Sequence, residues 1–70
     1  MDIKQAKALR PGARVSFSED RGVPSGQGPV VAINPTTHTT HIGHEYVWVE
    51  VYMCTQQHAA LWPSNRLTAS

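Results

Sequence analysis

The feature that most constrains this chain is a run of alternating residues at positions 46–54. Its aliphatic members occupy every second position, and a β-strand directs alternate side chains to opposite faces. The members of this apolar set are Val47, Val49, Val51 and Met53. The spacing predicts a strand with one face packed into a core, and three of the four residues are β-branched, which favours a strand.

The opposite face of the same strand carries aromatic side chains around one carboxylate: Tyr46, Trp48, Glu50 and Tyr52. Aromatic faces stack on bases or hold cations, and they also pack well in protein interfaces. These aromatics therefore either form a free binding surface or are covered by the N-terminal helix or by a second subunit. We predict a ligand or partner surface that also includes Trp62, Arg14 and Arg66.

The residues after this strand predict a hairpin and a return to the core. Polar residues at 55–57 break the apolar run, and residues 58–62 can form a second, antiparallel strand. Pro63 has no N–H for the ladder and is expected to end that strand, while residues 64–65 favour a tight turn. Leu67 then re-enters the core.

Residues 2–9 predict one or two helical turns at the start of the chain. Asp2 is a suitable N-cap, and Pro11 followed by Gly12 ends the helical segment. An isolated helix this short is marginal, so it must dock to persist. The face that docks is made of Ile3, Ala6 and Leu9.

Two further strands are expected before the long one. Alternation at residues 13–17 predicts the first, and residues 18–28 form a long connecting loop. Residues 29–33 predict the second strand, with Val31 and Ile33 directed inward. Residues 36–44, rich in threonine and histidine, form either a long hairpin arm or an ordered loop.

A chain of 70 residues is expected to form a single domain spanning residues 1–70. A domain this small buries only roughly 60% of the surface of its unfolded chain, so self-association would add stability. One cysteine provides no internal disulfide and indicates a reducing compartment. No leader and no membrane-spanning apolar run is recognised, so we expect a soluble, cytoplasmic protein with no membrane contact. The net charge of +1 lacks the strongly basic character of an obligate nucleic-acid binder.

The order of these elements resembles the small SH3-like barrels, which include Tudor-like and KOW-type modules. The resemblance covers nearly the whole chain and is carried by Leu9, Pro11, Gly12, Val15, Gly28, Val31, Ile33, Trp62, Pro63, Ser64 and Leu67. It implies an all-β fold, a five-stranded SH3-like barrel preceded by a short helical turn. Such barrels bind RNA, methylated lysine or peptides, and at least one is an enzyme, so the fold leaves the function open.

The enzyme with this scaffold is the plasmid-borne dihydrofolate reductase, to which the chain is similar in length and order. The Val-Gln-Ile-Tyr-Pro segment of that family falls on residues 59–63, where the proline and an aromatic residue are retained. The glutamine that contacts ligands in that family corresponds to Ala60, and its lysines after the first strand motif correspond to residues 16–18, Ser-Phe-Ser. The resemblance therefore implies the scaffold without its chemistry, and we expect no enzymatic activity and no cofactor.

A modest basic edge is predicted near the N-terminus. Lys4 and Lys7 lie one helical turn apart, and Arg10 is expected to follow on the same side. These residues either contact phosphate or form an ordinary solvated helix face.

His38, His41 and His44 recur at every third position, and imidazole binds zinc, copper and nickel. Residues three apart point to opposite faces of a strand, so only a bent loop would gather them, with Glu45 as a fourth group. We therefore predict no metal site and keep the three histidines as weak candidates. Cys54 and His58 would meet across the predicted hairpin, but no third orienting group is evident.

These observations favour a non-catalytic binding module that contacts a protein partner or a second copy of itself through the aromatic strand face. A nucleic-acid-binding module that combines the basic edge with the aromatics is the alternative. A relative of the plasmid-type reductases is the third possibility, which Ala60 disfavours.

Overall fold

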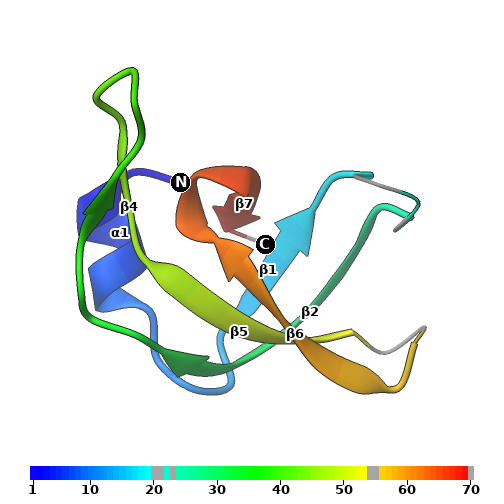
Figure 1. Ribbon diagram of the computed structural model, residues 1–70. Helices are drawn as coiled ribbons and strands as arrows, with labels where there is room; N and C mark the ends of the chain where they lie inside the picture. Colours follow the sequence, from blue (N-terminus) through cyan, green and yellow to red (C-terminus); the bar gives the residue numbers. More distant parts are fainter. Residues whose placement is uncertain (20–21, 23, 54–55, 70) are drawn as a thin grey trace.

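The structure, a computed structural model, describes residues 1–19, 22, 24–53 and 56–69. Its elements follow the chain in the order shown in Figure 1. They are α1 (Ile3–Ala8), β1 (Arg14–Phe17), β2 (Gly26–Ile33), β3 (His38–Thr39), β4 (Glu45–Tyr46), β5 (Trp48–Met53), β6 (His58–Pro63), the 3₁₀ turn η1 (Ser64–Arg66) and β7 (Leu67–Ala69). Within the described ranges there is no helix with the length and apolar character needed to cross a membrane.

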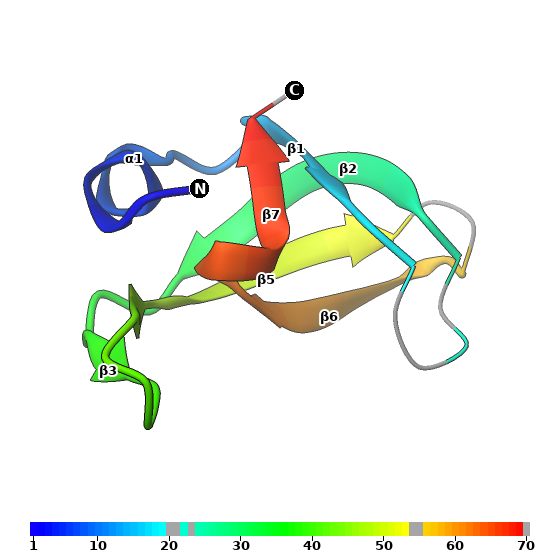
Figure 2. The ribbon, with the colours of Figure 1, turned by 90° about the horizontal axis from the view of Figure 1, so that it is seen from above.

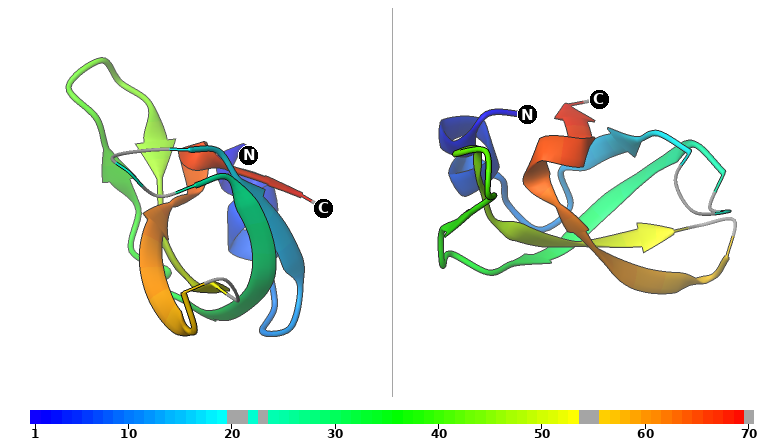
Figure 3. Two further views of the ribbon diagram at one scale, coloured as in Figure 1. Left: turned by 90° about the vertical axis from the view of Figure 1, so that its right-hand side faces the viewer. Right: turned by 45° about the horizontal axis from the view of Figure 1, so that its top comes forward.

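Five of the strands form one antiparallel sheet in the order β6-β5-β2-β1-β7. The sheet curls strongly, as the view in Figure 3 (left) shows, and α1 lies at one end of it. Strands β3 and β4 form a separate two-stranded hairpin that projects from the body of the molecule (Figure 1). The chain is thus a small sheet-rich domain whose five-stranded antiparallel sheet is compatible with a barrel-like fold.

The core lies on the concave side of this sheet, and the alternation predicted for β5 is confirmed. The four aliphatic residues of the long run, Val47, Val49, Val51 and Met53, are at most 1% exposed. Val15 and Phe17 of β1 are also buried, as their alternation predicts. Leu67 returns to the core at the start of β7, where it is 1% exposed.

The N-terminal helix forms and docks as predicted. Asp2 is its N-cap, and the Gln5 N–H donates to Asp2 Oδ1 at 2.8 Å. Ala6 is fully buried, while Ile3 and Leu9 pack against the core from partly buried positions. Because so short a helix gains little from its own hydrogen bonds, this docked face is what holds α1 in place.

Strand β2 differs from its prediction in length and in side-chain direction. It begins at Gly26, so the last residues of the predicted 18–28 loop belong to the strand. Its pairing with β5 is irregular between Val30 and Ala32, where one extra residue is accommodated. Val30 is therefore inside, at 2% exposure, and Val31 is outside, at 44%. The predicted inward direction of Val31 is wrong because the bulge shifts the alternation, whereas Ile33 does pack against the core.

At Gly28 the backbone of β2 lies close to the backbone of β5. A Cβ atom built at this residue would clash with the carbonyl oxygen of Tyr52 and would lie 3.5 Å from a methyl carbon of Val51. The backbone of β2 can pass this point only without a side chain.

The hairpin of β5 and β6 is confirmed, and β6 extends one residue further than predicted. Pro63 is the last residue of β6 and pairs with Trp48. The proline thus ends the strand, as predicted, but is itself part of it. Ser64 then joins η1 to the core through two hydrogen bonds. The Val47 N–H donates to Ser64 Oγ at 3.0 Å, and the Ser64 N–H donates to the Val47 carbonyl at 2.9 Å.

Candidate interaction surface

Three rings form a row along β3, β4 and β5. The Tyr46 ring meets the Trp48 ring edge-to-face, with centroids 5.6 Å apart and an interplanar angle of 89°. The His38 ring stacks on Tyr46 at 5.5 Å and 25°. His38 lies directly opposite Tyr46 in the β3–β4 pairing, so the hairpin register brings these rings together. We call His38, Tyr46 and Trp48 the aromatic row.

The convex side of β5 and β6 continues from this row. The register places Trp48 opposite Pro63, Glu50 opposite Leu61 and Tyr52 opposite Ala59. On the other side of β5, Glu50 also faces Ala32 of β2. We call this continuous set the outer strand face; its members are Val31, Ala32, Tyr46, Trp48, Glu50, Tyr52 and Leu61.

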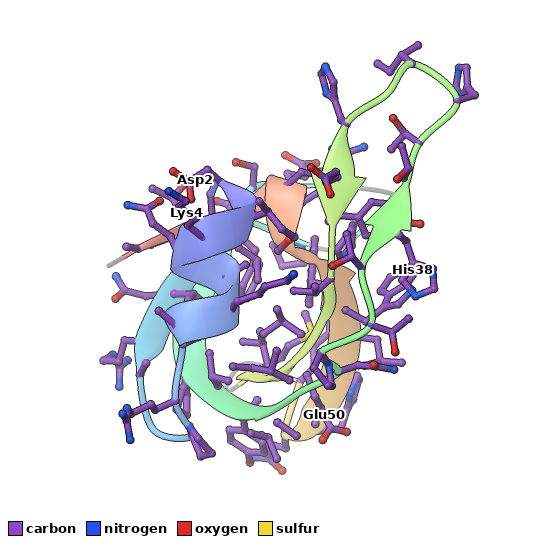
Figure 4. All side chains as sticks on the ribbon, turned by 90° about the vertical axis from the view of Figure 1, so that its left-hand side faces the viewer. Asp2, Lys4, His38 and Glu50 are labelled. Carbon is purple, nitrogen blue, oxygen red and sulfur yellow. The ribbon has the colours of Figure 1, made fainter. Side chains whose placement is uncertain are left out.

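Much of the outer strand face is apolar and open to solvent. Leu61 is 64% exposed, Val31 44% and Tyr52 37%, while Glu50 between them is partly buried. In Figure 4, Glu50 lies at the opposite end of the molecule from Asp2 and Lys4, which belong to the region of α1. Since an exposed apolar set of this kind costs solubility, it is a candidate contact surface.

Trp62 does not belong to this surface, although the sequence predicted it there. Its side chain is 7% exposed and stacks on Phe17, with ring centroids 4.9 Å apart and an interplanar angle of 24°. The alternation along β6 explains the error, because Trp62 shares the inner face and Leu61 the outer one. Leu61 is the residue that sequence reasoning missed, and the pairing of residue 61 with Glu50 is the signal that identifies it.

The two predicted arginine anchors lie outside the β5–β6 region. Arg14 is exposed on β1, opposite Pro29 of β2, and β2 separates it from β5 in the sheet. Arg66 is exposed at the end of η1.

The predicted basic edge is only partly assembled. Lys4 and Lys7 are exposed on α1, but the helix ends at Ala8 and the backbone of Leu9 is extended, with φ −62° and ψ 145°. Arg10 therefore does not continue the helix face, and that expectation is wrong. Lys7 and Arg10 line two different hollows on either side of Leu9.

The three predicted histidines are not gathered. His38 belongs to the aromatic row, whereas His41 and His44 are exposed in the turn between β3 and β4. This turn is held by the His44 N–H, which donates to Thr40 Oγ1 at 3.1 Å. No group of three His, Cys, Asp or Glu side chains that could hold a metal ion occurs among the residues described. Cys54 lies outside those residues, so the contact considered between Cys54 and His58 is not tested.

Ala60, at the position of the ligand-contacting glutamine of the reductases, is partly buried on β6 and packs against the core. The chain was also compared with protein-family models, with curated proteins and with solved structures, and no match was found. Its function is therefore inferred from the geometry described above.

Proposed function

We propose that this chain is an SH3-like barrel. Four of its strands, β1, β2, β5 and β6, follow one another as antiparallel neighbours, and the last strand, β7, returns to pair with β1. Such a return wraps a meander around a single core, and the buried residues of every strand of the five-stranded sheet belong to one cluster. The helical turn α1 covers one end of that core.

We infer that the domain is a non-catalytic interaction module that binds a protein partner or a second copy of itself through the outer strand face. The observation that carries this proposal is the exposure of Leu61, 64%, beside Tyr52, 37%, and Val31, 44%, on adjacent strands. Single exposed apolar residues are common on monomeric proteins, but neighbouring ones on one face mark a contact region.

The chemistry of the face suits a protein more than a nucleic acid. Its single charged residue, Glu50, would repel a phosphate backbone, and it lies between Ala32 and Leu61. In the aromatic row, the rings pack against one another, so the Tyr46 face covered by His38 is not open to a base. Aromatic residues among aliphatic ones are typical of the centre of a protein interface.

The direct test compares two exposed aliphatic residues of equal character. Leu61 on the face is 64% exposed, and Ile42 at the tip of the β3–β4 hairpin is 66% exposed. We expect Leu61→Ser to weaken self-association or partner binding by about tenfold, and Ile42→Ser to leave it unchanged. Sedimentation equilibrium measures self-association, and titration with a captured partner measures partner binding; both variants are tested in each assay. Equal behaviour of the two variants would remove the outer strand face from consideration.

A second variant separates contact from packing. Trp48→Ala should abolish binding while folding stays intact if the aromatic row contacts the partner. Thermal unfolding of the same variant provides the control, because a purely structural Trp48 would instead lower the melting temperature.

Nucleic-acid binding is the alternative proposal, favoured by the exposed side chains of Lys4, Lys7 and Arg10. An NMR titration with a mixed-sequence single strand at low and moderate salt tests it. Shifts at these residues and at Trp48 that weaken steeply with salt would support this alternative, because phosphate contacts release counterions.

A further inference from the structure

A groove lies between the end of α1 and the carboxyl-terminal part of β2. In Figures 1 and 2 this part of β2 runs toward the side of the molecule on which α1 lies. The groove has a volume of about 610 Å³ and is lined by Lys7, Leu9, Pro11, Val31, Ala32, Ile33 and Pro35. This volume falls in the range of about 300–1,000 Å³ that is typical of small-molecule sites.

Of the lining residues that the structure describes, all but one have apolar side chains. Leu9 and Ile33 pack their inner sides on the core and are partly exposed toward the groove. Val31 is turned outward by the bulge in β2 and is 44% exposed. The rings of the two prolines are hydrocarbon, and their backbone nitrogens carry no N–H to donate. The groove therefore favours an apolar body of ligand size.

Among the described residues that line the groove, Lys7 is the only charged one. It is exposed in the last turn of α1, and no carboxylate of the described ranges forms an ion pair with it. An ammonium at the rim of an apolar surface attracts an anion more strongly than one in bulk water, because the local dielectric constant is lower. We propose that this groove binds a small organic anion, with its carboxylate or sulfonate on Lys7 and its apolar body on Leu9, Val31 and Ile33.

The charge distribution also sets the orientation of the ligand. Ala32 lines the groove and lies opposite Glu50 in the β2–β5 ladder. An anionic group at that end would be repelled by the Glu50 carboxylate, whereas at the other end it meets Lys7. The acid therefore lies toward α1 and the apolar body toward β2. This site does not depend on the proposed interaction through β5 and β6, although the two surfaces share Val31 and Ala32.

Two probes of the same shape test the proposal. 8-Anilinonaphthalene-1-sulfonate carries one anionic group on an apolar body, and N-phenyl-1-naphthylamine has the same rings without the charge. We expect the anionic probe to bind the folded chain in a saturable, one-to-one manner, with a Kd below about 1 mM. Amide shifts mapped by NMR should include Lys7, Leu9 and Val31.

Matched lysine variants test the role of the charge. Lys7→Gln should weaken binding of the anionic probe about three- to fivefold, the effect of one partly solvated ion pair, and should leave the uncharged probe unaffected. Lys4→Gln is the control, because Lys4 is exposed on the same helix but does not line the groove. An equal loss in both variants, or no saturable binding, would overturn the proposal. Both residues are exposed, so neither change should unfold the chain, and circular dichroism checks this.

Two further variants locate the apolar body. Ala32→Phe fills the groove from an exposed position and should weaken both probes about tenfold. Leu61→Ser changes the outer strand face outside the groove and should leave both affinities unchanged. If Leu61→Ser removed probe binding, the probe would lie on the outer strand face and the proposed groove site would be wrong. If Leu61→Ser abolished only self-association or partner binding, both proposals would stand.

Discussion

Substitution of Gly28 by alanine is the sharpest test of how β2 and β5 are held together. The Cβ atom of Gly28→Ala would overlap the carbonyl oxygen of Tyr52, which is backbone and cannot turn away. Gly26, on the same strand, is the matched control. A Cβ atom there would meet only the Phe17 ring, at 3.2 and 3.3 Å, and a ring can shift by a few tenths of an ångström.

The cost of Gly28→Ala follows from three contributions. Overpacking of a close contact costs about 1–3 kcal/mol, and a displaced ladder hydrogen bond costs about 1 kcal/mol more. The lower entropy of the unfolded alanine chain offsets about 0.4–1 kcal/mol. The net destabilisation is about 2 kcal/mol, which corresponds to a fall in melting temperature of about 8–16 °C for a domain of this size.

Urea unfolding followed by tryptophan fluorescence measures this change, because Trp62 lies in the core. We expect Gly26→Ala to alter the free energy of unfolding by less than about 1 kcal/mol, since ring adjustment and chain entropy act in opposite directions. A Gly28→Ala variant as stable as Gly26→Ala would refute the close approach of β2 to the Tyr52 carbonyl.

Three other substitutions test the remaining contacts. Ser64→Ala removes the acceptor of the buried Val47 N–H and should cost about 1–3 kcal/mol, with faster hydrogen exchange at Val47; unchanged protection there would contradict the contact. Asp2→Ala removes the N-cap and should cost about 1 kcal/mol, with loss of protection at the Gln5 amide as the local readout. Trp62→Ala should cost about 3–5 kcal/mol in urea unfolding, whereas a solvent-exposed tryptophan would cost far less.

The parts of the fold that were predicted correctly depend on local rules. The alternation of the long strand identified its buried face, because a single strand carries its own period of two. The N-cap at Asp2 and the docking face of α1 were likewise predictable from a few consecutive residues. The core position of Leu67 followed from the turn that precedes it.

The errors arose where one strand meets another. Val31 was expected inside, but the pairing of β2 with β5 contains a bulge that puts Val30 there instead. Trp62 was predicted to lie on the surface with Tyr46 and Trp48, but its side chain is only 7% exposed. The phase of β6 against β5 decides which of Leu61 and Trp62 is buried, and β6 is too short and too uniformly apolar to reveal that phase.

The candidate site shows the same division. Tyr46, Trp48 and Tyr52 were predicted to share one face; Trp48 and Tyr52 do so on β5, and Tyr46 of β4 joins them through its ring contact with Trp48. His38 and Leu61 joined that face only through the registers of β3 with β4 and of β6 with β5. Lys7 lines the groove beside β2 only because α1 docks there.

The sequence by itself determined the N-terminal helix, the approximate positions of the strands of the large sheet and the buried side chains of the long strand, because periodicity and capping act within a few residues. The tertiary structure alone decided the bulge in β2, the inward turn of Trp62 and the groove beside Lys7. Each of these depends on pairing between distant segments, and a register shift of one residue exchanges the two faces of a strand. Short-range pattern therefore specified the elements, and long-range packing specified the surface that they present.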